Sequence, residues 1–545
     1  MDYFSYPFHI STLKNHILKD PLCDWYNIQD FIGNTDYVKD KANHYNDFIM
    51  GDSNRYRNNL INDIKNKAGL KLNVDPSIYE TVDLIKDNFP LILNGKLLFD
   101  KNMIVICDII IRYDYFKKIF SKIENIPFHI YLDNNQYMLI NISYSSINFK
   151  IDLKETYSDG ILMYKKCCLY SFQKCMEKII NYNAKCFILG REYYYKKIQL
   201  PREEFIGFVL FDNKIKNKYR SAYEWIINLR NNYSKMSINP RPSCIELYPN
   251  MNYKESNWEK EKYKLANNIK EITLVWNISY EDRCDYLKKG IECWDDNTLL
   301  LHLKESKKKS IQERMIHMNK TNDILIYPRK TVSSGLNQVL KVENNIYFDV
   351  ESFLSFDERY NFFDTTIKND RPVLAIIGFI YNNNYYDYTI ERFKLEEEEK
   401  IVLRFSEDLL KISKNMELNV YHWGNAENNY MKYIYNKYPS IKFPKLNLIN
   451  ILDYFRTEPI IVQGVFKFGL KSIGRALYKN KLIETTWNET DNGLDSMIQF
   501  KDICMKHTKK IPIKRYKEIK DIVDYNYIDC KVLEEIVNLL RKIYA

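Results

Sequence analysis

The stretch Ile346-Tyr-Phe-Asp-Val-Glu351 decides the fold of the C-terminal part of this chain. It is a short apolar strand interrupted by two acids, Asp349 and Glu351, and the two-residue period of a strand directs both side chains to the same face. Two carboxylates directed at one place repel each other unless a cation lies between them. A carboxylate between Phe348 and Val350 is also costly unless it binds something. The pair therefore indicates a divalent metal site, although Asp-x-Glu alone also occurs in solvated surface strands.

Two later segments supply further acids. In Tyr421-His-Trp-Gly-Asn-Ala-Glu427 a strand runs into a helix, with Glu427 in the first helical turn. Tyr525 and Asp529 are four residues apart, which places a phenol and a carboxylate on one face of a helix. Glu427 alone could instead stabilise the helix dipole. The ordered set is more specific than any member, and it is predicted to form one site: Asp349, Glu351, Glu427, Tyr525 and Asp529.

The surrounding pattern predicts one α/β domain over residues 341–545. Apolar strands are expected at Val373–Ile380 and Leu418–Trp423, and helices at Ala426–Tyr438 and Tyr516–Tyr544. A further helix is expected at Lys400–Ile412, with Glu396–Glu399 at its start as favourable dipole-end charge. About 200 residues is an ordinary size for one domain.

The rest of the chain divides into three predicted parts. Residues 1–200 contain the apolar runs Met103–Ile111 and Tyr137–Tyr144, which are interpreted as strands of a mixed α/β domain. Residues 201–300 are interpreted as a helical connecting region, with a helix from Lys260 to Ile278 among the clearest. Residues 301–340 are polar and basic, and are interpreted as a linker. The predicted fold class is therefore α/β throughout.

Composition sets limits on the class of protein. Lys and Arg total 81 against 71 Asp and Glu, a net charge of +10, which permits a nucleic-acid partner without demonstrating one. Abundant Asn, Lys, Ile and Tyr, beside only 15 Gly and 15 Pro, indicate an AT-rich genome that inflates the Lys count. The eleven cysteines form no CxxC pair, so free and mostly buried thiols are expected.

No membrane segment or leader is apparent in the sequence. No apolar run approaches the ~20 residues of a membrane span. The first ten residues lack the basic-then-apolar order of a signal peptide. We therefore expect an intracellular, soluble protein without a membrane partner, located in the cytoplasm or, if the source is viral, in a virus factory.

The ordered acids resemble the DEDD exonucleases of the ribonuclease H-like superfamily, in the subgroup that carries a tyrosine. The finer resemblance is to the YprB-like branch, in which the middle acid follows a His-containing strand, as Glu427 follows His422 here. Phe468-Gly-Leu-Lys-Ser-Ile473 is similar to that branch's "sLKsia" segment. Tyr525-Asn526 with Asp529-Cys530 is similar to its "YNxxDC". The resemblance covers about residues 341–545.

This resemblance implies a metal-dependent 3′→5′ exonuclease that acts on DNA or RNA, with a single-stranded 3′ end as substrate and a helicase or a replication or repair protein as a possible partner. Two Mg²⁺ or Mn²⁺ ions would be held by Asp349, Glu351, Glu427 and Asp529. Tyr525 would orient the attacking water. Lys471 is a candidate for phosphate contact, or an ordinary surface lysine. His422 lies in the same nucleic-acid-binding region, and an internal hydrogen-bonding role is favoured for it over a general base.

Residues 1–200 resemble, more distantly, the RecB-like nuclease domains of the PD-(D/E)xK class, which accompany this exonuclease fold. Asp108 lies at the position of the family's metal-binding Asp. The next strand presents Asn141 and Ser143 where Asp-x-Lys is expected. Arg55 and Arg57 replace an upstream acid. Asn lacks the charge of a carboxylate and Ser lacks that of a lysine, so this domain is predicted to be an inactive nuclease fold.

Two alternatives remain open at the level of sequence. The chain could be a non-catalytic nucleic-acid-binding or scaffold protein in which both nuclease folds are relics. It could also be a structure-specific endonuclease that uses the same acids. A built-in helicase motor is excluded at motif level, because the sequence has no Gly-x-x-x-x-Gly-Lys-Ser/Thr loop.

Overall fold

The structure is a computed structural model, and its described residues form two compact units, within residues 4–269 and within residues 270–544. The described residues are 4, 6–40, 44–69, 72–123, 125–126, 133–253, 257–321, 324–330, 336, 340, 343–353, 373–392, 395–488, 498, 500, 503 and 512–544. Among the described helices, none combines the length and the apolar character needed to cross a bilayer. The predicted α/β class is confirmed, because both units contain a mixed sheet covered by helices.

The second unit is built on a five-stranded sheet whose central strand is β12 (Asn345–Phe353). Strand β13 (Val373–Tyr381) pairs with it antiparallel on one side, and β15 (Leu418–His422) pairs with it parallel on the other. The outer strands are β14 (Asn384–Thr389), antiparallel to β13, and β16 (Leu446–Asn450), parallel to β15. The strands predicted from Ile346, Val373 and Leu418 are thus confirmed.

Helices α13 (Leu395–Ser413) and α14 (Ala426–Lys437) belong to the core on one face of this sheet. Ile346, Phe348 and Val350 of β12 point into that core, as alternation along a strand requires. The alternate side chains of β12, which include its two acids Asp349 and Glu351, therefore point to the opposite face of the sheet.

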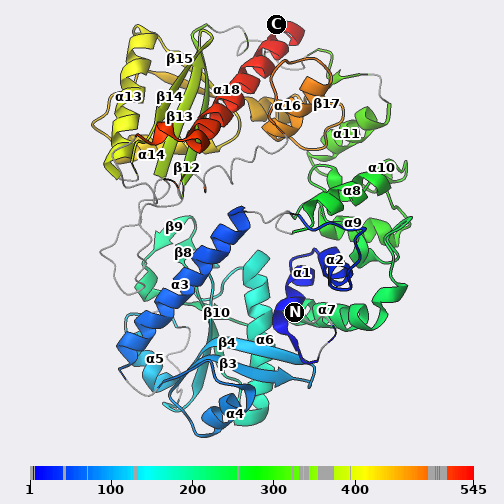
Figure 1. The fold of residues 1–545 in the computed structure, drawn as a ribbon, viewed down its shortest axis with the longest axis vertical. Helices are drawn as coiled ribbons and strands as arrows, with labels where there is room; N and C mark the ends of the chain where they lie inside the picture. Colours follow the sequence, from blue (N-terminus) through cyan, green and yellow to red (C-terminus); the bar gives the residue numbers. More distant parts are fainter. Residues whose placement is uncertain are drawn as a thin grey trace. The chain divides into compact units, whose positions relative to one another are not determined.

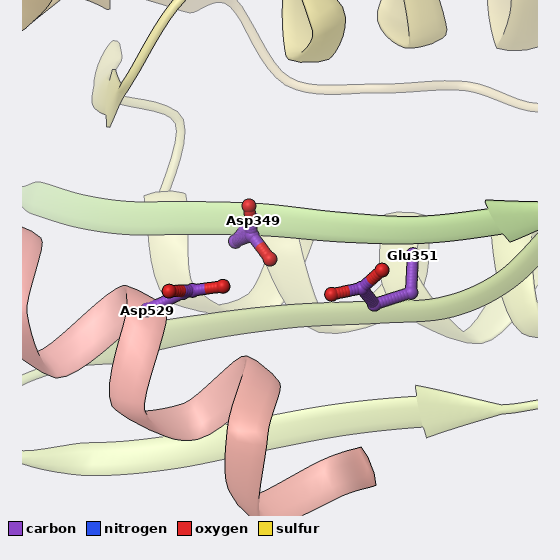
Figure 2. Close-up of side chains that lie close together, drawn as sticks. All are labelled: Asp349, Glu351 and Asp529. Carbon is purple, nitrogen blue, oxygen red and sulfur yellow. The ribbon is translucent and has the colours of Figure 1, made fainter. Parts of the chain in front are cut away.

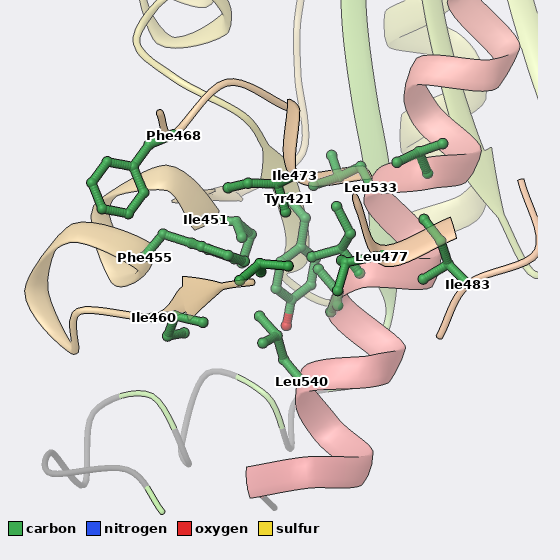
Figure 3. Close-up of a cluster of buried hydrophobic side chains, with 14 of the residues drawn as sticks. Tyr421, Ile451, Phe455, Ile460, Phe468, Ile473, Leu477, Ile483, Leu533 and Leu540 are labelled. Carbon is green, nitrogen blue, oxygen red and sulfur yellow. The ribbon is translucent and has the colours of Figure 1, made fainter. Parts of the chain in front are cut away.

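Helices α18 (Lys517–Tyr544) and α16 (Leu470–Lys479) pack in the core on the opposite face. Figure 3 shows part of this core, in which Tyr421 of β15 lies among apolar side chains that include Leu477 of α16 and Leu533 of α18. The predicted C-terminal helix is confirmed. Because its apolar side chains are buried against the sheet, its polar residues Tyr525, Asn526 and Asp529 are held close to the sheet.

The described residues of the range 301–340, which was predicted as a linker, instead belong to the second unit. They contain helix α11 (Lys309–Thr321) and strand β11 (Ile326–Tyr327), which pairs antiparallel with β17 (Ile461–Val462). The lysines that suggested a linker lie mainly before and at the start of the helix. Apolar side chains spaced three or four residues apart are buried in the core of the unit, at Ile311, Met315 and Met318.

A buried acid lies at the start of α13, where sequence indicated only favourable end charge. Glu398 is fully buried, and its carboxylate accepts hydrogen bonds from the backbone N–H of Leu374 (2.9 Å) and the hydroxyl of Tyr438 (2.8 Å). Lys437 donates to the same carboxylate at 2.7 Å. Glu398 therefore joins α13 to β13 and α14, because every charge and lone pair so buried needs a partner.

The remaining elements of the second unit are short. The helix predicted from Lys260 to Ile278 ends at Ile269, and a 3₁₀ turn, Ile272–Leu274, follows in the second unit. The other helices and 3₁₀ turns of this unit are α9 (Tyr280–Lys288), α10 (Leu299–His302), α15 (Ile451–Thr457) and Ile513–Arg515.

The first unit has a seven-stranded mixed sheet in the order β10-β7-β5-β4-β3-β2, with β1 beside β4. The strands predicted at Met103–Ile111 and Tyr137–Tyr144 are confirmed as β4 and β5, which pair antiparallel. A small sheet joins β6, β8 and β9. The strands are β1 (Phe8–His9), β2 (Asn73–Val74), β3 (Leu91–Phe99), β4 (Met103–Arg112), β5 (Tyr137–Ile142), β6 (Ser146–Asn148), β7 (Lys185–Leu189), β8 (Glu192–Tyr195), β9 (Ile198–Leu200) and β10 (Gly207–Val209).

Helices cover this sheet. Residues Tyr56, Leu60 and Ile64 of the long helix α3 pack with apolar side chains of β3, β4 and β5, and α6 also packs along β3 and β4. The ten described cysteines form no disulfide bond with one another, and seven of them are buried, as predicted. The helices are α1 (Lys14–Ile17), α2 (Leu22–Phe31), α3 (His44–Ala68), α4 (Ile78–Lys86), α5 (Tyr113–Ile119), α6 (Gly160–Ile180), α7 (Asn213–Asn232) and α8 (Glu259–Ile269).

Candidate metal centre

Three of the predicted acids meet over the middle of the second unit's sheet. Figure 2 shows Asp349 and Glu351 on strand β12 and Asp529 on helix α18 close together. One carboxylate oxygen of each lies within 4.8 Å of those of the other two. Asp529 is 8% exposed and the two strand acids are half-buried. Acids 180 positions apart in the sequence therefore form one cluster.

The cluster is strongly unfavourable as three bare charges. Burial, followed by the charges of Asp529 and Glu351, raises the pKa of Asp349 well above its usual range. Burial and the charge of Asp529 raise the pKa of Glu351 likewise. Burial raises the pKa of Asp529 to about 6, although Lys471, Trp487 and Tyr525 act in the opposite direction. Asp349 and Glu351 therefore hold protons near neutral pH unless a cation replaces them, whereas Asp529, with a pKa of about 6, is largely ionised there.

Asp349 is held by a chain of hydrogen bonds that the sequence did not reveal. The side-chain amide of Asn526 donates to Asp349 Oδ2 at 2.7 Å, and the hydroxyl of Tyr385 donates to Asn526 Oδ1 at 2.8 Å. Asn526 follows Tyr525 in the "YNxxDC" segment, so the resemblance marked its position without giving it a role. No motif or spacing in the sequence indicated that Tyr385, on β14, would contact Asn526.

A glycine makes room for this chain. Gly378 of β13 is the cross-strand neighbour of Asp349. A Cβ atom at Gly378 would lie 1.7 Å from Asn526 Oδ1 and 2.8 Å from the hydroxyl oxygen of Tyr385. The absence of a side chain at residue 378 is therefore required for Asn526 to reach Asp349.

Asp529 is oriented by two aromatic side chains. Trp487, 4% exposed, donates its indole N–H to Asp529 Oδ1 at 2.7 Å. Tyr525, one helical turn before Asp529, also hydrogen-bonds to its carboxylate. Burial and the charge of Asp529 raise the pKa of Tyr525, so its phenol remains protonated and donates. The structure thus places Tyr525 beside the acids, and it adds Trp487, which sequence analysis missed.

If the cluster holds Mn²⁺, replacement of Trp487 by phenylalanine is expected to weaken Mn²⁺ binding about tenfold, because a donor that hydrogen-bonds to a carboxylate ligand fixes the orientation of that ligand. The melting temperature should also fall, since the smaller ring leaves a void and a buried acceptor loses its donor. Isothermal titration calorimetry measures the first effect. Trp294→Phe is the control: Trp294 is also buried in the second unit but packs against Phe466, so its variant should lose stability and keep Mn²⁺ affinity. Equal Mn²⁺ affinity for Trp487→Phe and wild type would contradict this role.

Lys471, the candidate phosphate contact, lies beside the cluster. Its ammonium is 4.5 Å from the centre of the Tyr525 ring, and its charge opposes the rise in pKa of both Glu351 and Asp529. It stands in the first turn of α16, whose start matches the "sLKsia" segment. A cation is thus positioned at the rim of an acidic site.

Glu427 and His422 lie next to the cluster and outside the group of three. Glu427, in the first turn of α14 as predicted, is 6% exposed, and its charge raises the pKa of Asp349. His422 Nδ1 is 3.5 Å from Glu427 Oε2, and neither ring nitrogen has a hydrogen-bond partner within the described part of the chain. His422 is completely buried, so the structure gives nucleic acid no direct access to its ring, contrary to the nucleic-acid-binding role predicted for it.

In the first unit, Asp108 is neutralised by protein cations. Arg57 donates to Asp108 Oδ1 from Nε (3.0 Å) and Nη2 (2.7 Å). Burial raises the pKa of Asp108, but Lys165, Arg57 and the N–H of Ile142 outweigh burial, and the pKa lies below its usual range. Asn141, at the place of a second acid, accepts from the N–H of Asp108 instead. Asp108 is therefore a buried acid whose charge is balanced by hydrogen bonds and cations of the protein.

Comparison with known proteins gives one match and two negative results. The chain is 24% identical over 366 residues to the eukaryotic translation initiation factor 2-alpha kinase PK4 of Plasmodium berghei (strain Anka). The match covers 61% of this chain, and the chain spans about 13% of the length of that relative. No family model matches the sequence, and no solved structure matches the fold significantly.

The match contradicts the enzymatic activity predicted from the sequence. The relative is by its name a protein kinase, which points away from a 3′→5′ exonuclease. The predicted exonuclease activity is therefore wrong, and we assign no phosphodiester cleavage to this chain. The carboxylate cluster is a property of the structure and stands independently of that assignment.

Proposed function

We propose that the second unit binds divalent cations, Mg²⁺ or Mn²⁺, through Asp349, Glu351 and Asp529. The observation that carries this proposal is the meeting of three carboxylates within 4.8 Å in a largely buried site. Their mutual repulsion is relieved when a cation lies among them. Hard cations such as Mg²⁺ prefer carboxylate oxygen ligands of this kind.

The residues around the acids suit such a centre. Asn526 donates to Asp349 Oδ2 and Trp487 to Asp529 Oδ1, and each hydrogen bond fixes the orientation of a carboxylate that would bind a cation. Glu427, whose charge raises the pKa of Asp349, would support a second ion directly or through water. When bound, the cation would supply positive charge that polarises and orients an oxyanion ligand.

We propose that this oxyanion is a phosphate group of a nucleic-acid strand. A cation held by few protein carboxylates retains positions for phosphate oxygens. Lys471 stands beside the acids as a second positive group, and the chain carries a net charge of +10. The expected partner is therefore DNA or RNA, bound more tightly when the metal is present.

Metal affinity is expected to rise steeply with pH between 5 and 8. Burial raises the pKa of Asp529 to about 6 and that of the other two acids further, so a cation must displace protons at low pH. Each displaced proton makes the affinity about tenfold weaker per pH unit below the pKa of its group. Mn²⁺ calorimetry in two buffers of different ionisation enthalpy counts the protons released. Binding that is absent, or that is independent of pH, would contradict the metal centre.

The metal-free protein should show the opposite dependence in its stability. The folded state binds more protons than the unfolded state between pH 3.8 and about 6, through Asp529, so its free energy of unfolding falls as pH rises through that window. Mn²⁺ should therefore raise the melting temperature more at pH 7.5 than at pH 5.

We infer in addition that the second unit has a ribonuclease H-like fold and the first a restriction-endonuclease-like fold, as the sequence resemblances imply. A mixed sheet with Asp-x-Glu on its central strand and the last helix against it supports the first inference. Asp108, with Asn141 on the antiparallel neighbouring strand, supports the second. An experimental structure of each unit would test both inferences.

A further inference from the structure

In the first unit, two cationic side chains from two helices lie beside one buried carboxylate. Asp108 on β4 is 6% exposed and receives two N–H groups of Arg57 from α3 and the backbone N–H of Ile142 (2.7 Å) at the end of β5. Arg57 also donates to the side chain of Asn94 on β3. Asp108 is thereby hydrogen-bonded at both oxygens by groups of the protein itself.

Lys165 of α6 is a second cation at this place. Its ammonium is 3.8 Å from Asp108 Oδ2, an ion-pair distance too long for a hydrogen bond. Lys166, the next residue, provides a contrast: it is 3% exposed and donates to Thr156 O (2.9 Å), Tyr157 O (3.1 Å) and Ser158 Oγ (2.6 Å). Lys166 thus has a structural role, whereas the Lys165 ammonium donates no hydrogen bond to the residues that the structure describes.

Arg57, Lys165 and Asp108 together carry a net positive charge. Two cations oppose one carboxylate, and the side chains of Arg57 and Lys165 are 28% and 25% exposed, so solvent reaches both. Since Arg57 already satisfies the acid, a further cation would meet net repulsion, and an anion would meet attraction. A compact ammonium with unused donors is a good phosphate ligand.

We propose that Arg57, Asp108 and Lys165 form a metal-independent phosphate-binding site for a nucleic-acid strand, in which Arg57 neutralises Asp108 and Lys165 contacts the phosphate. The choice of a nucleic-acid strand rests on the nucleic-acid partner proposed above. The site itself rests only on contacts within the first unit.

The test measures binding of a fluorescent single-stranded oligonucleotide to the full chain by anisotropy, in EDTA, over a series of salt concentrations. Lys165→Ala is expected to weaken binding about fivefold to tenfold and to reduce the salt slope by roughly 0.7, the value for one phosphate contact on a single strand. Lys174→Ala is the matched control. Lys174 lies on the same helix and is 41% exposed, but it is paired with Glu177 at 2.7 Å, so its variant should bind like wild type.

Asp108→Asn separates an anion site from a cation site. Removal of the carboxylate charge should tighten oligonucleotide binding about fivefold if the site binds phosphate, whereas a metal site would lose affinity. Unchanged binding by Lys165→Ala, or weaker binding by a folded Asp108→Asn protein, would overturn the proposal. The substitution Lys165→Ala could also weaken the binding of inorganic pyrophosphate and leave oligonucleotide binding unchanged. That result would overturn the assignment of a nucleic-acid strand as the ligand.

The phosphate-binding site and the metal centre can be tested independently of each other. EDTA removes the divalent cations from the second unit, so the Lys165 effect is measured without them. Conversely, Mn²⁺ calorimetry on Lys165→Ala should give wild-type affinity, because Lys165 belongs to the other unit.

Discussion

Replacement of Gly378 by alanine is expected to cost about 3 kcal/mol of folding free energy, in the upper range for an overpacked core position. The added Cβ would stand 1.7 Å from Asn526 Oδ1 and 2.8 Å from the hydroxyl oxygen of Tyr385, so both side chains must move. Asn526 then loses its contact with Asp349, and buried polar groups are left without partners. Thermal or urea unfolding of the metal-free protein measures the loss.

Gly469→Ala is the control for this substitution. A Cβ at Gly469 would meet only Ser472 Oγ, at 3.7 Å, and the backbone φ of −76° suits any residue. That variant should lose much less stability than Gly378→Ala, because its cost is limited to the poorer N-cap that alanine makes at the start of α16. An unchanged unfolding midpoint for the Gly378→Ala protein would show that Asn526 can leave Asp349 without cost. The hydrogen bonds from Tyr385 through Asn526 to Asp349 would then not contribute to stability.

Asp349→Asn is expected to reduce Mn²⁺ affinity at least ~100-fold, because cation affinity depends on the number of charged ligands. The asparagine can still accept the hydrogen bond from Asn526, but it then turns its own NH₂ group towards the other acids. In the absence of metal, the same variant should be as stable as wild type or more stable, since one of three repelling carboxylates is gone. Calorimetry and thermal unfolding in EDTA test the two parts separately.

Asp387→Asn provides the matched comparison. Asp387 lies on β14 of the same sheet and pairs with Lys514, outside the cluster. Its loss should leave Mn²⁺ affinity unchanged and remove only an ion pair that is about one-third exposed, worth roughly 0–1 kcal/mol. Equal Mn²⁺ affinity in Asp349→Asn and Asp387→Asn would refute the centre at Asp349.

The three acids could be predicted from sequence because each obeys a local rule. The period of a strand placed Asp349 and Glu351 on one face, and the period of a helix placed Asp529 above Tyr525. Asn526, Trp487 and Gly378 could not be predicted in the same way. Their roles depend on contacts across 29 to 177 residues, which no local spacing encodes.

The misread linker and the misread function have different causes. In the linker, an excess of lysine obscured the apolar repeat of Ile311, Met315 and Met318, which the folded core makes plain. For the function, the ordered acids identified a cluster but not a reaction, because a fold and a ligand set can host many activities. The kinase match removes the nuclease assignment and leaves the geometry of the cluster unchanged.

The position of Asp529 on α18 has a consequence for the protein during its synthesis. Asp349 and Asp529 are separated by 180 positions. At about 5–20 residues per second, a ribosome needs roughly 10–40 s to connect them. During that interval the emerging strand carries two acids without Asp529 or Asn526. If the proposed centre binds a cation, its set of ligands is complete only once α18 has been synthesised, because Asp529 and Asn526 both lie on that helix.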